Sequence, residues 1–152
     1  MQLTPNFSMA EFTETSHREF DNTLPPELMS NALRTCYMLE NIRSYLAVQA
    51  LRPIRIFLTS GYRSQLVNRA VGSDDSSDHR HADAADFKAP DFGEPFLVAT
   101  ALKSVVDELG IGQLIFEYGR WIHVSPVPRK NPINRVISIW GKKDVRVGIV
   151  RQ

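Results

Sequence analysis

The sequence lacks most of the features that would place it in a special class of protein. It has a single cysteine, Cys36, so no disulfide can form within the chain, and its place on the apolar side of a predicted helix favours a core-filling role. Lysine and arginine number 18 against 17 aspartates and glutamates, which gives no general reason to expect nucleic-acid binding, although a local basic patch is compatible with this balance. No stretch approaches the roughly 18 consecutive apolar residues of a membrane span, so we expect no membrane association.

The N-terminus also lacks the marks of a secretory signal peptide. The first seven residues, MQLTPNF, contain neither a basic start nor an apolar run. We therefore expect the protein to be cytoplasmic on synthesis unless another agent releases it. With 152 residues, 43% of them hydrophobic and 23% charged, and with no repeat or linker, the chain is predicted to form a single domain over residues 1–152.

Hydrophobic periodicity predicts helices mostly in the first part of the chain and strands mostly in the second. A capping box, Ser8 with Glu11, predicts a short helix that ends near Phe12. Apolar residues at helical spacing predict longer helices over residues 26–46 and 95–109, and a short helix is predicted over residues 64–71. Strands are predicted over residues 54–59, 84–87, 114–117, 121–125, 136–140 and 145–150, the last four as two hairpins. This pattern is typical of an α+β fold with an antiparallel sheet.

Three residues could together hold a metal ion. His79 and Asp86 are separated by six residues, and His123 lies far downstream within an apolar strand. Two imidazoles and one carboxylate form a ligand set that zinc accepts, with a fourth position left open for catalysis. Spacing alone favours a simpler interpretation, in which Asp86 is a hydrogen-bond acceptor at a strand end and His123 is an ordinary half-buried histidine.

Three motifs in order change that balance. Ser60-Gly61-Tyr62-Arg63-Ser64, the segment from Ser77 to Asp86 (SDHRHADAAD), and Trp121-Ile122-His123-Val124-Ser125 together resemble the zinc D-alanyl-D-alanine carboxypeptidase family. That family includes VanX-type dipeptidases and phage L-alanyl-D-glutamate endopeptidases, and it shares its fold with hedgehog proteins. The likeness runs from about Leu3 to Ser125 and is greatest to small phage or prophage members.

The resemblance implies a fold, a cofactor and roles for named residues. The fold is the hedgehog/D-Ala-D-Ala-peptidase type, an antiparallel sheet with helices packed mainly from the N-terminal half. One Zn²⁺ ion is held by His79, Asp86 and His123. Arg63 binds the substrate and steadies the developing oxyanion or a carboxylate, a task suited to its fixed fork of donors. Ser77 either hydrogen-bonds the substrate or only orders its loop.

The chain departs from the family pattern at two points. Ala82 stands where the family usually has glycine, and a positive φ there would cost stability or tilt His79. The acid that serves as general base in several relatives is displaced, because Arg120 and Trp121 occupy its positions and the nearest acid is Glu117. An odd number of loop residues would place Glu117 on the same face as His123, whereas an even number would leave it a surface acid.

These observations lead to one favoured function and two alternatives. The favoured function is a zinc-dependent peptidase that cuts the stem peptide or cross-link of bacterial peptidoglycan, as a carboxypeptidase or as an endopeptidase of the endolysin type. Such a phage or prophage enzyme would reach the cell wall through a holin pore or as a virion component. The alternatives are a VanX-like cytoplasmic dipeptidase and a non-catalytic virion or wall-binding module that retains the fold.

Overall fold

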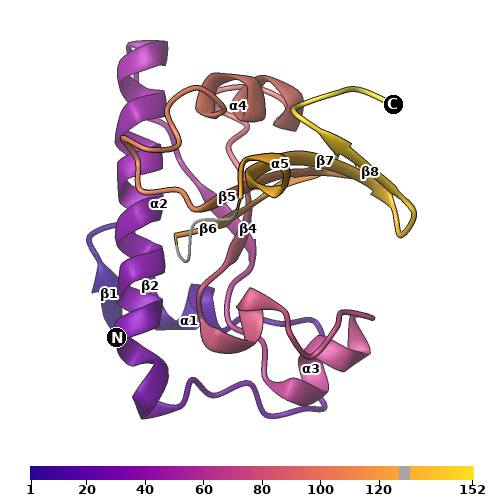
Figure 1. Ribbon diagram of the computed structural model, residues 1–152. Coiled ribbons are helices and arrows are strands. Elements are labelled where there is room, and N and C mark those ends of the chain that lie inside the picture. The colour runs from indigo at the N-terminus through magenta and orange to yellow at the C-terminus, as the bar shows by residue number, and fades with distance from the viewer. Residues whose placement is uncertain (127–130) are drawn as a thin grey trace.

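The computed structural model describes residues 1–126 and 131–152, and its centre is a six-stranded sheet with the strand order β3-β4-β6-β5-β7-β8 (Figure 1). The strands are β3 Phe57–Ser60, β4 Ala85–Lys88, β5 Gln113–Glu117, β6 Trp121–Ser125, β7 Val136–Gly141 and β8 Asp144–Val147. Two short strands, β1 Gln2–Thr4 and β2 Phe7–Ser8, pair separately. The fold is therefore α+β, as predicted.

The helices come mainly from the N-terminal half of the chain, as expected. They are α1 Met9–Phe12, the 3₁₀ helix η1 Pro26–Leu28, α2 Met29–Ala50, α3 Gln65–Ala70, the 3₁₀ helix η2 Asp78–His81, α4 Pro95–Leu102 and α5 Pro132–Arg135. The capping box of α1 is present, with Ser8 and Glu11 bonded reciprocally. The stripe of α2 that carries Cys36 is fully buried, so the core-filling role of the cysteine is confirmed.

The two faces of the sheet have different neighbours. Helix α4 lies above the sheet in the view of Figure 1, whereas α3 and the turn of η2 lie below it. Side chains along β5 and β6 alternate between the two faces of the sheet. Those of Phe116, Ile122 and Val124 point to one face and are buried in the hydrophobic core. The residues between them, including His123, point to the opposite face.

Some features of the predicted fold differ from the observed ones. The helix predicted over 95–109 ends at Leu102, and its remainder forms turns. Strand β3 begins at Phe57 because the backbone N–H of Arg55 donates to the Asp91 carboxylate instead of a neighbouring strand. The sheet is not wholly antiparallel, since β7 pairs with β5 in parallel.

The hairpins were predicted well. Strands β5 and β6 pair from Gln113 with Ser125 to Glu117 with Trp121, which leaves a loop of three residues. Strands β7 and β8 form the second hairpin, although β8 ends at Val147, before the predicted limit. No helix within residues 1–126 and 131–152 is long and apolar enough to cross a membrane.

Candidate metal centre

Strand pairing places the first two candidate ligands side by side. Asp86 on β4 and His123 on β6 are direct partners in the antiparallel register, so their side chains leave the same face of the sheet. His79 comes from η2, which precedes β4 and turns the chain towards that face. The Ser77 hydroxyl caps this 3₁₀ helix and accepts from the backbone N–H of His79 at 3.3 Å.

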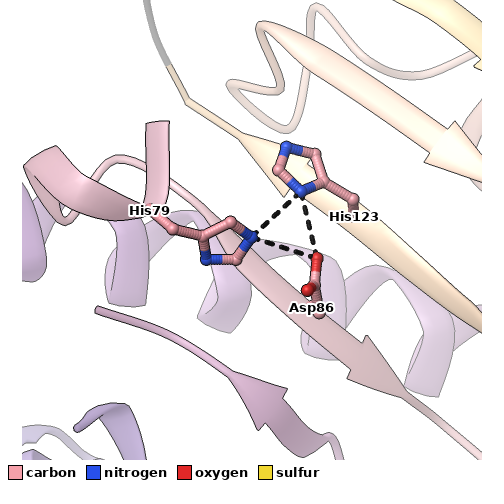
Figure 2. A group of neighbouring side chains, drawn as sticks. All are labelled: His79, Asp86 and His123. Carbon is pink, nitrogen blue, oxygen red and sulfur yellow. Dashed lines mark hydrogen bonds and ion pairs between the residues drawn. The ribbon is translucent and has the colours of Figure 1, made fainter. Parts of the chain in front are cut away.

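The three side chains converge on one point (Figure 2). His123 Nδ1 lies 3.0 Å from Asp86 Oδ1, His79 Nε2 lies 3.2 Å from His123 Nδ1, and His79 Nε2 lies 3.3 Å from Asp86 Oδ1. A tetrahedral zinc ion with bonds of about 2.0–2.1 Å requires ligand atoms about 3.3 Å apart. The triangle therefore has the size that zinc requires, and all three side chains are buried, with exposed fractions of 2%, 7% and 4% for His79, His123 and Asp86.

Hydrogen bonds orient two of the candidate ligands from behind. His79 Nδ1 lies 2.7 Å from the carbonyl oxygen of Gly61, which can only accept, so Nδ1 carries the proton and Nε2 offers its lone pair to the triangle. Arg63 Nη2 donates to Asp86 Oδ2 at 2.9 Å, which leaves Oδ1 facing the histidines. Such outer contacts are what metal sites use to fix ring and carboxylate orientation.

The three side chains of the triangle shift one another's pKa values. Burial lowers the pKa of His79, and this keeps its ring neutral, as a metal ligand must be. Burial also disfavours a charged His123, but the hydrogen bond and the negative charge of Asp86 outweigh it and raise the pKa of His123. Burial by itself would raise the pKa of Asp86, but the two neighbouring histidines outweigh it, so the pKa of Asp86 is lowered and the carboxylate is ionised.

Glu117 lies at the edge of the triangle. With its three-residue loop, the hairpin turns the Glu117 side chain to the face of His123, and Glu117 Oε1 lies 3.8 Å from His123 Nδ1. Burial, followed by the negative charge of Asp86, raises the pKa of Glu117. The odd-loop alternative is therefore the one the structure adopts, and Glu117 is not a surface acid.

A cavity of about 660 Å³ opens above the triangle. All six residues singled out from the sequence line it: Arg63, Ser77, His79, Asp86, Glu117 and His123. The Glu14–Ser16 segment, helix α3 and the loop before η2 contribute the rest of one side, and Tyr118 and Trp121 belong to the hairpin side. The site thus has both a ligand triangle and room for a substrate next to it.

Ala82, which stands where the family usually has glycine, adopts a backbone conformation with positive φ. Its φ is 58° and its ψ is 23°, in the left-handed region, at the end of η2. An L-residue there costs about 1–2 kcal/mol relative to glycine. Because Ala82 N–H bonds the carbonyl of His79 and its own carbonyl accepts from Thr35 Oγ1 at 2.8 Å, surrounding contacts hold the strained turn in place.

Two supporting residues were not singled out from the sequence. A Cβ on Gly61 would lie 2.3 Å from the carbonyl oxygen of Phe12, so only glycine allows this segment to approach α1 and present its own carbonyl to His79. Asn68 is fully buried, and its side chain contacts Arg63 Nη1 at 3.4 Å and donates to the Asp74 carbonyl at 2.7 Å. The motif around Gly61 carries a signal for the first, whereas nothing in the local sequence marks Asn68.

An α+β fold with two buried histidines and one aspartate beside an open cavity is typical of metal-dependent hydrolases. Residues 5–125 match the family model described as Peptidase M15, and the chain belongs to this family of metallopeptidases. The expected family is thereby confirmed over nearly the range that the motifs indicated. A search of curated proteins found no match to the sequence.

Proposed function

We propose that residues 1–152 act as one zinc peptidase domain that hydrolyses a peptide bond in bacterial peptidoglycan. The observation that carries the proposal is the buried triangle of His79, Asp86 and His123, whose edges of 3.0 to 3.3 Å suit one zinc ion and whose open side faces the cavity. A structural zinc site would be closed by a fourth protein ligand, and within the described residues no further histidine, cysteine or acid joins this group.

The chain's own residues divide the chemistry between them. When bound, zinc would polarise the scissile carbonyl and make water a stronger nucleophile near neutral pH. Glu117 takes the proton from the attacking water and passes it to the leaving amine, a role suited to a half-buried carboxylate with a raised pKa. Ser77 orders η2 through its bond to the His79 backbone, and because it also lines the cavity its hydroxyl can hydrogen-bond the substrate.

Arg63 serves both the metal ligands and the substrate. Its Nη2 holds Asp86, and its Nε donates to Ser60 Oγ at 2.8 Å, so the guanidinium plane is fixed beside the triangle. The contact of Nη1 with Asn68 is long, at 3.4 Å, so we assign this donor to the carbonyl oxygen on which negative charge grows.

The cavity favours a peptide chain over a free dipeptide. Its volume of about 660 Å³ falls within the range of sites that enclose drug-sized ligands, which is more space than two alanine residues fill, and it extends from Glu14 to Tyr118. We therefore place the scissile bond in the stem peptide or cross-link. Because the motifs resemble those of small phage and prophage enzymes, we also propose a phage or prophage origin, with delivery through a holin pore or as part of a virion.

Digestion of purified muropeptides followed by mass spectrometry tests this function. Wild-type protein loaded with one zinc ion per chain should release a defined peptide or amino acid, and the masses identify the bond. His79→Ala should abolish release, whereas Glu108→Gln, a change on the exposed surface, should leave it unchanged. If zinc-loaded wild-type protein releases nothing from muropeptides, the peptidase proposal is wrong. If it cleaves only free D-Ala-D-Ala, the VanX-like alternative holds.

A further inference from the structure

The C-terminal strands lie outside the family match but are built onto the catalytic hairpin. The match ends at residue 125, whereas β7 and β8 follow it and complete the sheet beyond β5. Strand β7 runs parallel to β5, with Ile137 beside Ile115 and Ile139 beside Glu117. The last residue pair between β5 and β7 therefore includes Glu117, the residue proposed as general base.

The turn after Glu117 is strained and is held from β7. Tyr118 has a φ of 54° and Gly119 a φ of 67°, so two consecutive residues adopt left-handed conformations. For a bulky residue such as tyrosine this conformation is unfavourable by itself and persists only where contacts enforce it. The Tyr118 backbone N–H donates to the carbonyl of Ile139 on β7 at 2.8 Å. We call β7 and β8 the C-terminal extension, and this bond joins the extension to the turn.

The indole of Trp140 covers the same turn. A Cβ on Gly119 would lie 2.9 Å from Trp140 Cη2, so the ring fills the space directly against the glycine. The ring also meets Phe116 edge to face, with centroids 5.5 Å apart, and its Nε1–H donates to the Val150 carbonyl at 3.1 Å. Trp140 therefore joins the C-terminal end of the chain to the outer side of the hairpin.

The inner side of the same turn lines the substrate cavity. Glu117, Tyr118 and Trp121 all border the cavity, and the rings of Tyr118 and Trp121 lie 5.6 Å apart. A shift of the turn would move the Glu117 carboxylate and the Tyr118 ring together. The metal triangle would be spared, because His79 and Asp86 come from other elements and His123 lies within the paired part of β6.

We propose that the C-terminal extension positions this wall of the active site, and that Trp140 is its positioning residue. The inference rests on the proposed peptidase function. Trp140 touches neither the substrate nor the metal ligands, and it acts by holding the strained Tyr118-Gly119 turn so that Glu117 faces the reacting water. Because a displacement of about 1 Å in such a group can cost on the order of 100-fold in rate, loss of Trp140 should lower turnover without loss of metal.

The test compares three variants with wild-type protein. Trp140→Ala removes the whole ring, and Trp140→Phe keeps an aromatic ring but is smaller than the indole, whose Cη2 and Cζ3 atoms cover Gly119. Leu46→Ala, in the buried core on α2, is the control for a loss of stability elsewhere. Zinc content, amide hydrogen exchange of residues 117–121, and kcat and KM on muropeptides are measured at a temperature where each variant is folded.

We expect both Trp140 variants to keep one zinc ion per chain and to exchange the Tyr118 amide faster. In Trp140→Ala, kcat should fall about tenfold or more with little change in KM, and Trp140→Phe should recover part of it. Leu46→Ala should keep the wild-type kcat and exchange in this turn. The inference is overturned if both Trp140 variants retain wild-type kcat, if exchange in residues 117–121 is unchanged, or if kcat falls only in proportion to zinc.

Each remaining outcome also decides the matter. If Trp140→Ala does not fold, Trp140→Phe is judged by the same criteria. If wild-type protein shows no peptidase activity, the proposed function fails by itself, and the exchange data still decide whether Trp140 holds the turn.

Discussion

Replacing Glu117 by glutamine should separate catalysis from metal binding. Glutamine has the same size but cannot take a proton from water, and a general base typically contributes about 10²–10⁴-fold to rate. We therefore expect kcat to fall by that factor, which corresponds to roughly 2.7–5.4 kcal/mol of transition-state stabilisation. Zinc affinity should change far less, because Glu117 is 3.8 Å from the nearest ligand atom and belongs outside the triangle.

The assay pairs single-turnover hydrolysis of a muropeptide with a zinc titration by a competing chelator. Glu108→Gln makes the same chemical change on the exposed surface and should match wild type in both measurements. The reasoning is refuted if Glu117→Gln retains turnover within about threefold of wild type, since a general base contributes far more than that. A zinc affinity that falls as steeply as kcat would instead show that Glu117 serves the metal.

Four further results are expected. Chelation of zinc should lower the melting temperature by about 5–10 °C if zinc was present at about 100 times its Kd. His79→Ala should remove this difference, and an equal shift in both proteins would contradict the assignment of His79 as a zinc ligand. Ala82→Gly should change the free energy of unfolding by between zero and about 1 kcal/mol in the stabilising direction, because relief of about 1–2 kcal/mol of strain opposes loss of about 0.8 kcal/mol of methyl burial; a clear loss in thermal unfolding would refute the strain. Burial, followed by the charges of Glu40 and Glu11, raises the pKa of Cys36 to about 12, so its thiol should resist a disulfide reagent at pH 8 until denaturant is added. The Arg55 hydrogen bond lowers the pKa of Asp91 from 3.8 to about 2, so any stability from this pair is present above pH 3.8 and is lost as pH falls towards 2. In an NMR titration, Arg55→Leu should raise the pKa of Asp91, and an unchanged pKa would refute the pairing.

Local pattern was sufficient where one element determined the outcome. The loop of three residues between β5 and β6 follows from the apolar runs on either side of Tyr118-Gly119-Arg120, and the loop length alone placed Glu117 on the face of His123. The capping box of Ser8 and Glu11 is similarly local. In these cases, the pattern of neighbouring residues in the sequence is enough to predict the pairing and the cap.

Contacts between distant segments explain what the sequence did not reveal. The parallel pairing of β7 with β5 depends on the route of the chain after β6, which periodicity does not encode. The bond from Arg63 to Asp86 joins residues that are 23 positions apart, so the family resemblance implied a substrate-binding role for Arg63 but not its contact with Asp86. The early end of α4 at Leu102 likewise reflects turns whose apolar residues, Val106 and Leu109, are buried without being helical.

An anomalous-difference map recorded at the zinc absorption edge, from crystals of the purified protein, tests the central claim most directly. We expect one strong peak at about 2.0–2.2 Å from His79 Nε2, His123 Nδ1 and an Asp86 carboxylate oxygen, with no fourth protein ligand. A peak elsewhere, or none after zinc is supplied at saturating concentration, would contradict the assignment of these three residues as the metal centre.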